Sequence, residues 1–322
     1  MFTGNDEQEI NVGSAPSSGF AILAPSENDK VSVSGRISKL DGDSTIGNFT
    51  QKGDLDLNGH TLTVTGNMTQ LGNIHLNGGT LIVKGNYLQS GGTMYVENGK
   101  LNVSGDYLIR SLNTNGEYNY TNAALNMTDA GGYMTVGGDF VTQSALSDSS
   151  NVLTAGTLEL NGNFTQLFGN GVSTNFSCAK DHKTILTGEK KQKIYFEDRK
   201  NSYFGTLEIN KKNRDNIDLI NYSASEIVWI YENLSFLTAD EVEVGKLVAV
   251  AGHADGGKAP YTYSFAFKRA TNTNWKTIGT AYSGETTAKI KPTSEGEYDL
   301  RVIAKDSAGT RIAKTFKVKV TK

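Results

Sequence analysis

An aspartate, a histidine and a tyrosine recur at equivalent positions of a repeated sequence. Asp56, His75 and Tyr95 are separated by 19 and 20 residues, and equivalent residues of stacked strands lie about 4.8 Å apart. A carboxylate, an imidazole and a phenol at that spacing could bind a sugar or a metal ion. The alternative is a solvated outer face, where any polar side chain is tolerated. Because the set lacks the further ligands of a zinc site, the sequence predicts no bound metal.

Two further tyrosines lie in a segment that interrupts the repeats. Residues 111–123, SLNTNGEYNYTNA, follow Arg110 and place Tyr118 and Tyr120 beside Asn and Glu side chains. Insertions between repeats form surface loops, and exposed aromatic rings stack on sugars or anchor protein partners. The alternative is that both rings fold back over the adjacent repeat. If the protein recognises a ligand, we expect the site on this insertion and the neighbouring face.

The residue types of catalysis are present, but their spacing does not combine them. The chain has four histidines: His60, His75, His182 and His253. None is paired by spacing with a Ser or Cys nucleophile. Asp54 and Asp56 lie in one predicted strand, and their surroundings contain no calcium-loop pattern. Cys178, the only cysteine, is expected to be a small core residue. The sequence therefore predicts no catalytic residue and no cofactor.

A repeat of about 19 residues positions these candidates. Its units open at Gly47, Gly66, Gly85 and Gly105, with spacings of 19, 19 and 20. Each unit contains three short segments of alternating apolar residues, which is typical of one turn of a three-strand β-solenoid. The side chains expected to stack inward are Phe49, Met68, Tyr87 and Tyr107; Leu55, Ile74 and Met94; Leu57, Leu76 and Val96; Leu62, Leu81 and Leu101; and Val64, Val83 and Val103. The pairs Asn58-Gly59, Asn77-Gly78 and Asn98-Gly99 are expected at one corner, because Asn and Gly tolerate positive φ.

The pattern continues less regularly to residue 209, with a second insertion at residues 144–151. We expect about eight turns in all. Residues 1–30 and 211–237 are expected to cap the two ends, because unpaired strand edges must be covered. No proline occurs from Ser26 to Ala259, as expected for a backbone that is paired almost throughout.

A different pattern begins at Glu241. Alternating strands are separated by Gly, Pro, Asn and Asp turns, which predicts an immunoglobulin-like sandwich. Tyr298 occupies the position of a corner tyrosine, and Phe265 and Trp275 are expected in or near the core. The predicted organisation is all-β: a three-strand-per-rung parallel β-helix with capping segments at 1–237, followed by an Ig-like β-sandwich at 238–322.

Composition narrows the function classes. The 322 residues carry a net charge of −3, with 37% hydrophobic and 20% charged residues. This is the composition of a folded protein, and the near-neutral charge argues against general nucleic-acid binding. No apolar run approaches the length of a membrane span, so we expect no membrane insertion.

Several runs resemble those of exported bacterial proteins. The run GGKAPYTYSFAFKRATNTNWKTIGT, with PTSEGEYDLRVIAKDSAG, resembles the triple-tyrosine or PKD-like Ig modules in surface proteins of Gram-positive anaerobic bacteria. The runs HKTILTGEKKQKIYFED and SYFGTLEI resemble the segment that closes the β-helical part of similar proteins. The period is similar to that of filamentous haemagglutinin-type adhesins, although the motif differs. The resemblance implies export to the cell surface and carries over no catalytic residue.

We therefore expect a non-enzymatic adhesive or structural module, extracellular or at the cell surface, that binds a glycan or a surface protein. The start MFTGNDEQEI shows no signal peptide, so we expect a portion of a longer exported protein in preference to a cytosolic one. The alternative is a polysaccharide-active β-helix enzyme, a lyase or hydrolase with an accessory Ig-like domain. Such an enzyme needs cooperating acidic groups. We expect Asp54 and Asp56 to face opposite sides of their strand, where they cannot cooperate.

Overall fold

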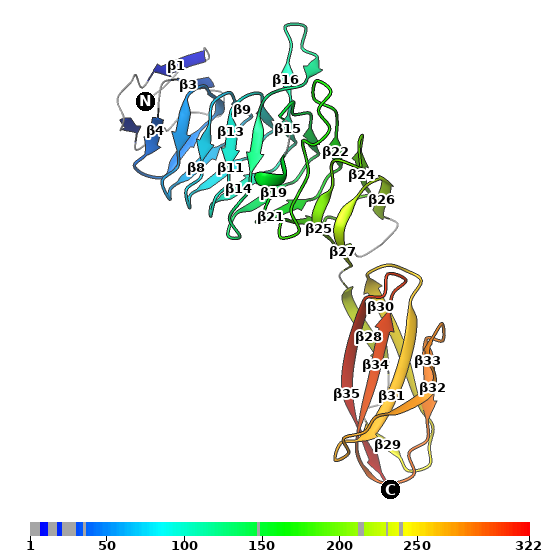
Figure 1. Ribbon diagram of the computed structural model, residues 1–322. Coiled ribbons are helices and arrows are strands. Elements are labelled where there is room, and N and C mark those ends of the chain that lie inside the picture. The colour runs from blue at the N-terminus through cyan, green and yellow to red at the C-terminus, as the bar shows by residue number, and fades with distance from the viewer. Residues whose placement is uncertain are drawn as a thin grey trace. The chain divides into compact units, whose positions relative to one another are not determined.

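The computed structural model describes residues 7–11, 18–20, 30–34, 37–146, 149–211, 216–229, 231–237 and 241–322. In these residues the chain is all-β apart from one short 3-10 helix, η1 (Ser149–Asn151) (Figure 1). It divides into two compact units, one formed by residues 1–208 and 215–227 and the other by residues 209–214 and 228–322. Across the described ranges, no helix is long and apolar enough to cross a lipid bilayer.

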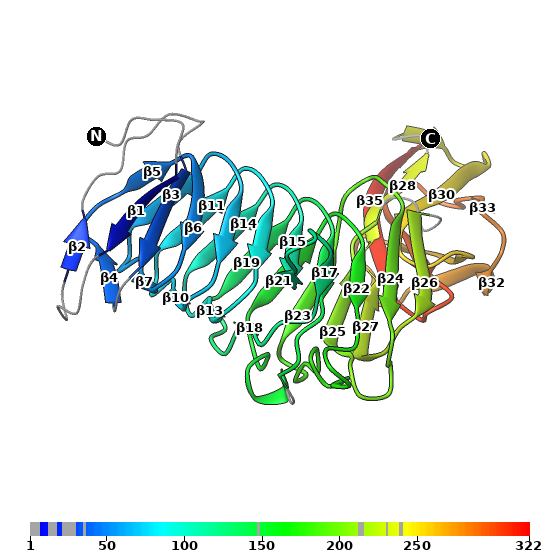
Figure 2. The same cartoon turned by 90° about the horizontal axis from the view of Figure 1, so that it is seen from above.

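The first unit contains three parallel sheets, and successive passes of the chain add strands to each (Figure 2). The ten-stranded sheet has the order β1 (Glu7–Asn11), β3 (Lys30–Ser34), β6 (Asn48–Gln51), β9 (Met68–Gln70), β12 (Tyr87–Gln89), β15 (Tyr107–Ile109), β20 (Phe140–Thr142), β22 (Phe164–Gln166), β24 (Gln192–Phe196) and β26 (Ile217–Asn221). The six-stranded sheet has the order β18 (Ala124–Asn126), β13 (Thr93–Tyr95), β10 (Ile74–His75), β7 (Asp54–Asp56), β4 (Ile37–Leu40) and β2 (Ser18–Phe20). The nine-stranded sheet has the order β27 (Ala224–Trp229), β25 (Phe204–Ile209), β23 (Lys183–Leu186), β21 (Thr157–Leu160), β19 (Tyr133–Val136), β14 (Lys100–Val103), β11 (Thr80–Val83), β8 (Thr61–Val64) and β5 (Ser44–Ile46).

The strand register confirms the inward columns that the repeat predicts. Met68 pairs with Phe49 on one side and with Tyr87 on the other, and all three side chains are buried. Leu81 lies between Leu62 and Leu101 in the same way. Each side chain packs on its equivalents in the neighbouring turns, so the columns form one continuous hydrophobic core.

Within the segments expected to cap the ends, the described strands extend the sheets. At the N-terminal end, β1 pairs with β3 and β2 pairs with β4. At the C-terminal end, β26 pairs with β24, and β27 lies next to β25. The strand β28 (Tyr231–Leu237) pairs antiparallel with β30 (Val248–Gly256), so it belongs to the second unit. An apolar alternating segment can be a cap or one more strand, and its pairing decides between the two.

The predicted corner needs one correction. Asn58 and Asn77 take left-handed backbone conformations, with φ of 50° and 44°, as expected. In the next turn the equivalent residue is Glu97, with φ of 50°, and the pair Asn98-Gly99 follows it by one position. The third unit is one residue longer, and the register of β13 with β10 therefore places Glu97 at the corner.

A ladder of polar side chains joins seven successive turns. The side-chain oxygen of Asn48 accepts the backbone N–H of Asn67 at 2.8 Å, and Asn67 accepts the N–H of Asn86 at the same distance. The same contact recurs along the series Asn86, Asp106, Asp139, Asn163 and Lys193. The side chain at this position in each turn thus satisfies a backbone donor of the next turn, which fixes the stacking register.

We expect the change of Asn86 to Ala to lower the free energy of unfolding of the first unit by about 1 kcal/mol, because the N–H of Asp106 loses its acceptor. Urea unfolding followed by circular dichroism measures the difference. Lys84→Ala, at an exposed position two residues away, is the control and should lie within about 0.5 kcal/mol of the parent. Equal effects of the two variants would show that the ladder contributes no stability.

Aromatic rings fill the core beside the ten-stranded sheet. The ring centroids of Tyr87 and Tyr107 lie 4.8 Å apart, and Phe140 and Phe164 continue the series at 5.5 Å steps. The buried hydroxyls of Tyr87 and Tyr107 donate to Gln70 Oε1 and Gln89 Oε1 at 2.8 and 2.7 Å. Burial raises the pKa of both phenols, so they remain neutral donors inside the core.

The second unit has two sheets. One contains β28, β30 and β33 (Thr287–Ile290). The other has the order β29 (Glu241–Glu243), β35 (Arg311–Thr321), β34 (Gly296–Lys305), β31 (Thr262–Arg269) and β32 (Lys276–Ser283). All pairs are antiparallel except β29 with β35. The buried core contains Val248, Val250, Ala254, Tyr263, Phe265, Ile290, Leu300, Val302, Ala304 and Val318.

Two aromatic residues of this unit have the positions expected from the sequence. Tyr298 is buried at the start of β34, and its hydroxyl lies 3.1 Å from the carbonyl oxygen of Ser294 and 3.0 Å from the hydroxyl of that residue. Trp275 is half-buried but is not among the side chains that pack against this core, and its ring centroid lies 4.3 Å from the Arg301 guanidinium, so its expected place in or near the core is not confirmed. Phe265 lies in the core itself.

Candidate ligand-binding surface

The structure brings Asp56, His75 and Tyr95 into one outward column of the six-stranded sheet. His75 pairs in register with Asp56 and with Tyr95. The rings of His75 and Tyr95 stack with their centroids 4.3 Å apart and their planes 6° from parallel. Each ring therefore covers one face of the other, which limits the ring surface left for a sugar.

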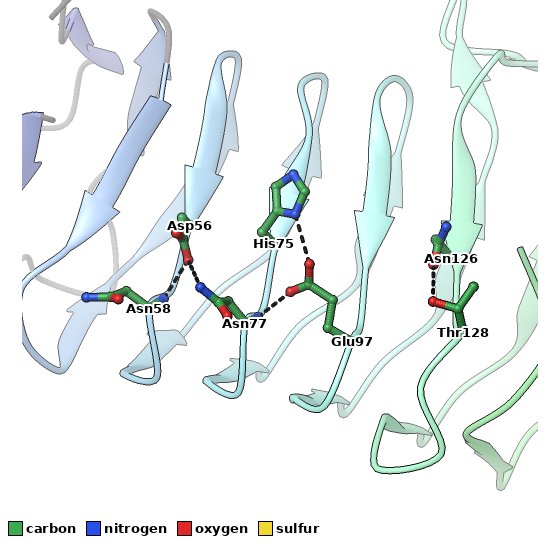
Figure 3. A network of polar contacts seen from close by, with 7 residues as sticks. All are labelled: Asp56, Asn58, His75, Asn77, Glu97, Asn126 and Thr128. Atoms are coloured by element: carbon green, nitrogen blue, oxygen red, sulfur yellow. Dashed lines mark hydrogen bonds and ion pairs between the residues drawn. The ribbon is translucent and has the colours of Figure 1, made fainter. Parts of the chain in front are cut away.

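The carboxylates around this column are engaged in holding the corner (Figure 3). Asp56 Oδ1 accepts the backbone N–H of Asn58 at 2.7 Å and the side-chain amide of Asn77 at 3.4 Å. Glu97 Oε1 lies 3.1 Å from His75 Nδ1, and Glu97 Oε2 accepts the N–H of Asn77 at 2.6 Å. These contacts join three turns, so this column has a clear structural role.

Glu97 is the member of this network that sequence reasoning missed. Its carboxylate reaches back to the preceding turn while its own backbone occupies the left-handed region. Its position in the repeat, equivalent to Asn58 and Asn77, would have identified it. The Asn-Gly pattern instead pointed to the next residue. The exact register was needed to recognise it.

The tyrosine insertion forms a short hairpin of β16 (Ser111–Leu112) and β17 (Tyr118–Asn119), which projects from the first unit (Figure 1). Leu112 and Tyr118 are cross-strand partners, so their side chains lie on the same face of the hairpin. They are 47% and 48% exposed, and Tyr120 is 39% exposed. Both tyrosines therefore keep much of their surface accessible in place of burying it against the adjacent turn.

Contacts at the base and the tip hold the hairpin in shape. The guanidinium of Arg110 lies 4.6 Å from the Tyr118 ring centroid, and Arg110 Nε donates to Gln143 Oε1 at 2.9 Å. At the tip, Asn113 Oδ1 accepts the backbone N–H groups of Asn115 and Glu117, both at 2.9 Å. A braced aromatic surface loses little conformational entropy on binding.

Further apolar side chains lie on the turns that follow the hairpin. Thr121, at the end of the insertion, forms a bridge with Ser144 in the next turn. Leu146, two residues beyond Ser144, is exposed. Phe168 is also exposed and follows β22 in the next turn. The same edge of three consecutive turns thus presents apolar surface, which the repeat pattern did not reveal because it arises in the irregular insertions.

Two of the remaining titratable candidates, Cys178 and His182, are buried. Cys178 is buried as expected, and burial raises the pKa of its thiol. His182 is also buried, and burial lowers the pKa of its imidazole to about 4. Among the described residues, no group of three or more His, Cys, Asp or Glu side chains is arranged to hold a metal ion.

No protein-family model matches this chain, and no curated protein matches it. Among solved structures, a superoxide reductase (neelaredoxin) from Ignicoccus hospitalis is 14% identical over 28% of this chain and 81% of its own, with a TM-score of 0.23. An engineered protein solved at 1.98 Å is 14% identical over 34% of this chain and 23% of its own, with a TM-score of 0.22. Likenesses this low carry no argument about fold or function.

Proposed function

We propose that the first unit is a three-strand-per-turn parallel β-helix and the second an Ig-like sandwich. The β-helix assignment is supported by three parallel sheets whose strands follow one another in successive turns. The Ig-like assignment is supported by two sheets of three and five strands and by the contact of Tyr298 with Ser294. A tyrosine bonded to the backbone just upstream is a hallmark of that fold.

We further propose that the protein is an exported, non-enzymatic module that binds a glycan through the hairpin face formed by Leu112, Tyr118 and Tyr120. The observation that carries this proposal is the pair of partly exposed tyrosines on a hairpin that Arg110 and Asn113 brace. Aromatic faces stack on the apolar faces of sugar rings, and amide side chains nearby supply hydrogen bonds.

The hydrogen bonding of the acidic side chains supports binding over hydrolysis. Asp54 Oδ1 accepts the backbone N–H of Asn73 at 3.2 Å, and Asp56 Oδ1 accepts that of Asn58 at 2.7 Å. Both side chains lie on the outward face of β7, one on each side of buried Leu55, so the expectation that they face opposite sides of the strand is wrong. A carboxylate that accepts a backbone N–H has a structural role in the fold.

The double change of Tyr118 and Tyr120 to Ala tests the site. Each aromatic contact contributes about 0.5–1.5 kcal/mol beyond its buried area, so we expect a loss of affinity of roughly tenfold or more. The ligand is taken from a glycan array probed with the full chain, and affinities are measured by calorimetry. Leu71→Ala, at another exposed apolar residue, is the control.

The outcomes separate the parts of the proposal. Unchanged affinity in the double variant, with an intact melting curve, would place the glycan site elsewhere. An array without any binder would contradict glycan recognition altogether. Release of reducing sugar from a bound polysaccharide would support the enzyme and overturn the non-enzymatic assignment.

A further inference from the structure

A cavity of about 140 Å³ lies within the first unit, beside the two insertions. Most of its lining is apolar and includes Ile109, Ala123, Leu125, Leu153 and Phe176. Leu146 also lines it and is 43% exposed, so the cavity reaches the surface beside this side chain. The cavity is distinct from the hairpin face proposed above as the glycan site.

The sequence explains why space is left here. Along one inward column of the ten-stranded sheet, Gln89, Ile109, Thr142 and Gln166 occupy equivalent positions in successive turns. Thr142 is the smallest of the four, so it leaves unfilled the volume that a glutamine occupies in other turns. The six-stranded sheet also ends at β18, and loop residues replace it as the wall of the next turn.

One polar group of the lining is unpaired. The Thr142 side chain is fully buried, and its Oγ1 has no hydrogen-bond partner within the described structure. The other polar side chains are already bonded: Ser144 Oγ donates to the Ala123 carbonyl at 2.7 Å, and Asn175 Nδ2 donates to the Ser144 carbonyl at 2.7 Å. Ser149 Oγ donates to the Thr174 carbonyl at 2.9 Å.

The size of the cavity and its lining indicate which kind of small molecule it would bind. An apolar cavity of roughly 150 Å³ accepts a molecule the size of benzene, and water enters such a space only where it finds several polar partners. A single unpaired hydroxyl adds a preference for one hydrogen-bonding group. The buried ring of Phe176 offers an aromatic surface for edge-to-face contact.

We propose that this cavity is a binding site for one small monohydroxylated aromatic molecule of the size of phenol. The ring occupies the space between Ile109, Leu153 and Phe176, and the hydroxyl pairs with Thr142 Oγ1. The cavity is partly open to solvent, and the exposed side chain of Leu146 lies at its lining. The proposal is independent of glycan binding, because neither Tyr118 nor Tyr120 lines the cavity.

Calorimetric titration of the full chain with phenol and with benzene tests the site. We expect one molecule of either to bind, with phenol tighter. Thr142→Val keeps the shape but removes the hydroxyl, so phenol should lose three- to tenfold in affinity while benzene changes less than twofold. Thr142→Gln restores the side chain present in other turns and fills the cavity, so both ligands should lose at least tenfold.

Thr165→Gln is the matched control, because Thr165 is half-buried on the outer face of neighbouring β22 and should leave both affinities unchanged. If Thr142→Gln does not fold, Ala123→Val reduces the same cavity from another wall and should also weaken both ligands. Failure of the unmodified chain to bind either probe at 10 mM (about 100 times a Kd of 0.1 mM) would overturn the proposal. So would unchanged binding in the cavity-filling variants.

Discussion

Replacing Leu81 with aspartate is expected to unfold the first unit at neutral pH. Leu81 is fully buried between Leu62 and Leu101, where a carboxylate finds no cation and no donor set. An unpaired charge in such a core costs several kcal/mol in addition to the lost packing, and the whole stability of a domain is about 5–15 kcal/mol. Loss of the cooperative melt in circular dichroism is the measurement.

Ile82→Asp provides the control for this result. Ile82 is the next residue of β11, and its half-buried side chain lies on the opposite face of the strand. The same charge placed there reaches solvent, so we expect a melting curve close to that of the parent. If the two variants melt alike, the inward column does not form the core.

The second large effect is a loss of stability in mild acid that depends on His182. Both ring nitrogens of this buried residue lack hydrogen-bond partners in the described structure. Burial lowers its pKa from the usual 6.5 of a histidine to about 4. Between these pH values the unfolded chain binds a proton that the folded chain does not, so stability falls as the pH falls from 6.5 to 4. The difference amounts to about 3 kcal/mol, and above pH 6.5 this contribution is constant.

The change of His182 to Leu isolates this effect. It removes the titrating group and two unsatisfied nitrogens, so we expect the variant to be more stable at pH 7 by about 1–3 kcal/mol. Denaturant unfolding at pH 7 and pH 4.5 should show a smaller difference in the variant than in the parent. His60→Gln, at a histidine whose side chain is 35% exposed, should retain the parental pH dependence. If His182→Leu lost as much stability between pH 7 and pH 4.5 as the parent, other groups would be responsible for the acid sensitivity.

The repeat made much of the first unit predictable. Phe49, Met68 and Tyr87 could be placed in one buried column because period-two alternation and a constant spacing each point to the same face. The prediction failed at Glu97 because the Asn-Gly pair lies one position later in that corner, although the strands on both sides of it keep one register with the preceding turn. The segment of β28 could not be assigned because alternation alone does not identify a strand's partner.

The candidate site was less accessible to sequence reasoning. Tyr118 and Tyr120 could be located because they lie in an insertion, but the exposure of their rings depends on how the hairpin is braced. The roles of Asp56 and His75 could not be read from their types, since their partners Asn77 and Glu97 lie in other turns. The cavity beside Thr142 is lined by segments that are distant in the sequence, so no local sequence pattern predicts it.

The polar ladder from Asn48 to Lys193 has a consequence for how such a chain can change length in evolution. Most turns present the same type of acceptor to the turn that follows and use the same backbone donor toward the turn before. Duplication of a whole unit therefore creates a junction that already exists elsewhere in the molecule, as in other one-dimensional arrays. Gain or loss of a single residue within a strand instead reverses the faces of the residues beyond it. Selection on length is thus expected to proceed in whole units, with irregular additions confined to the corners.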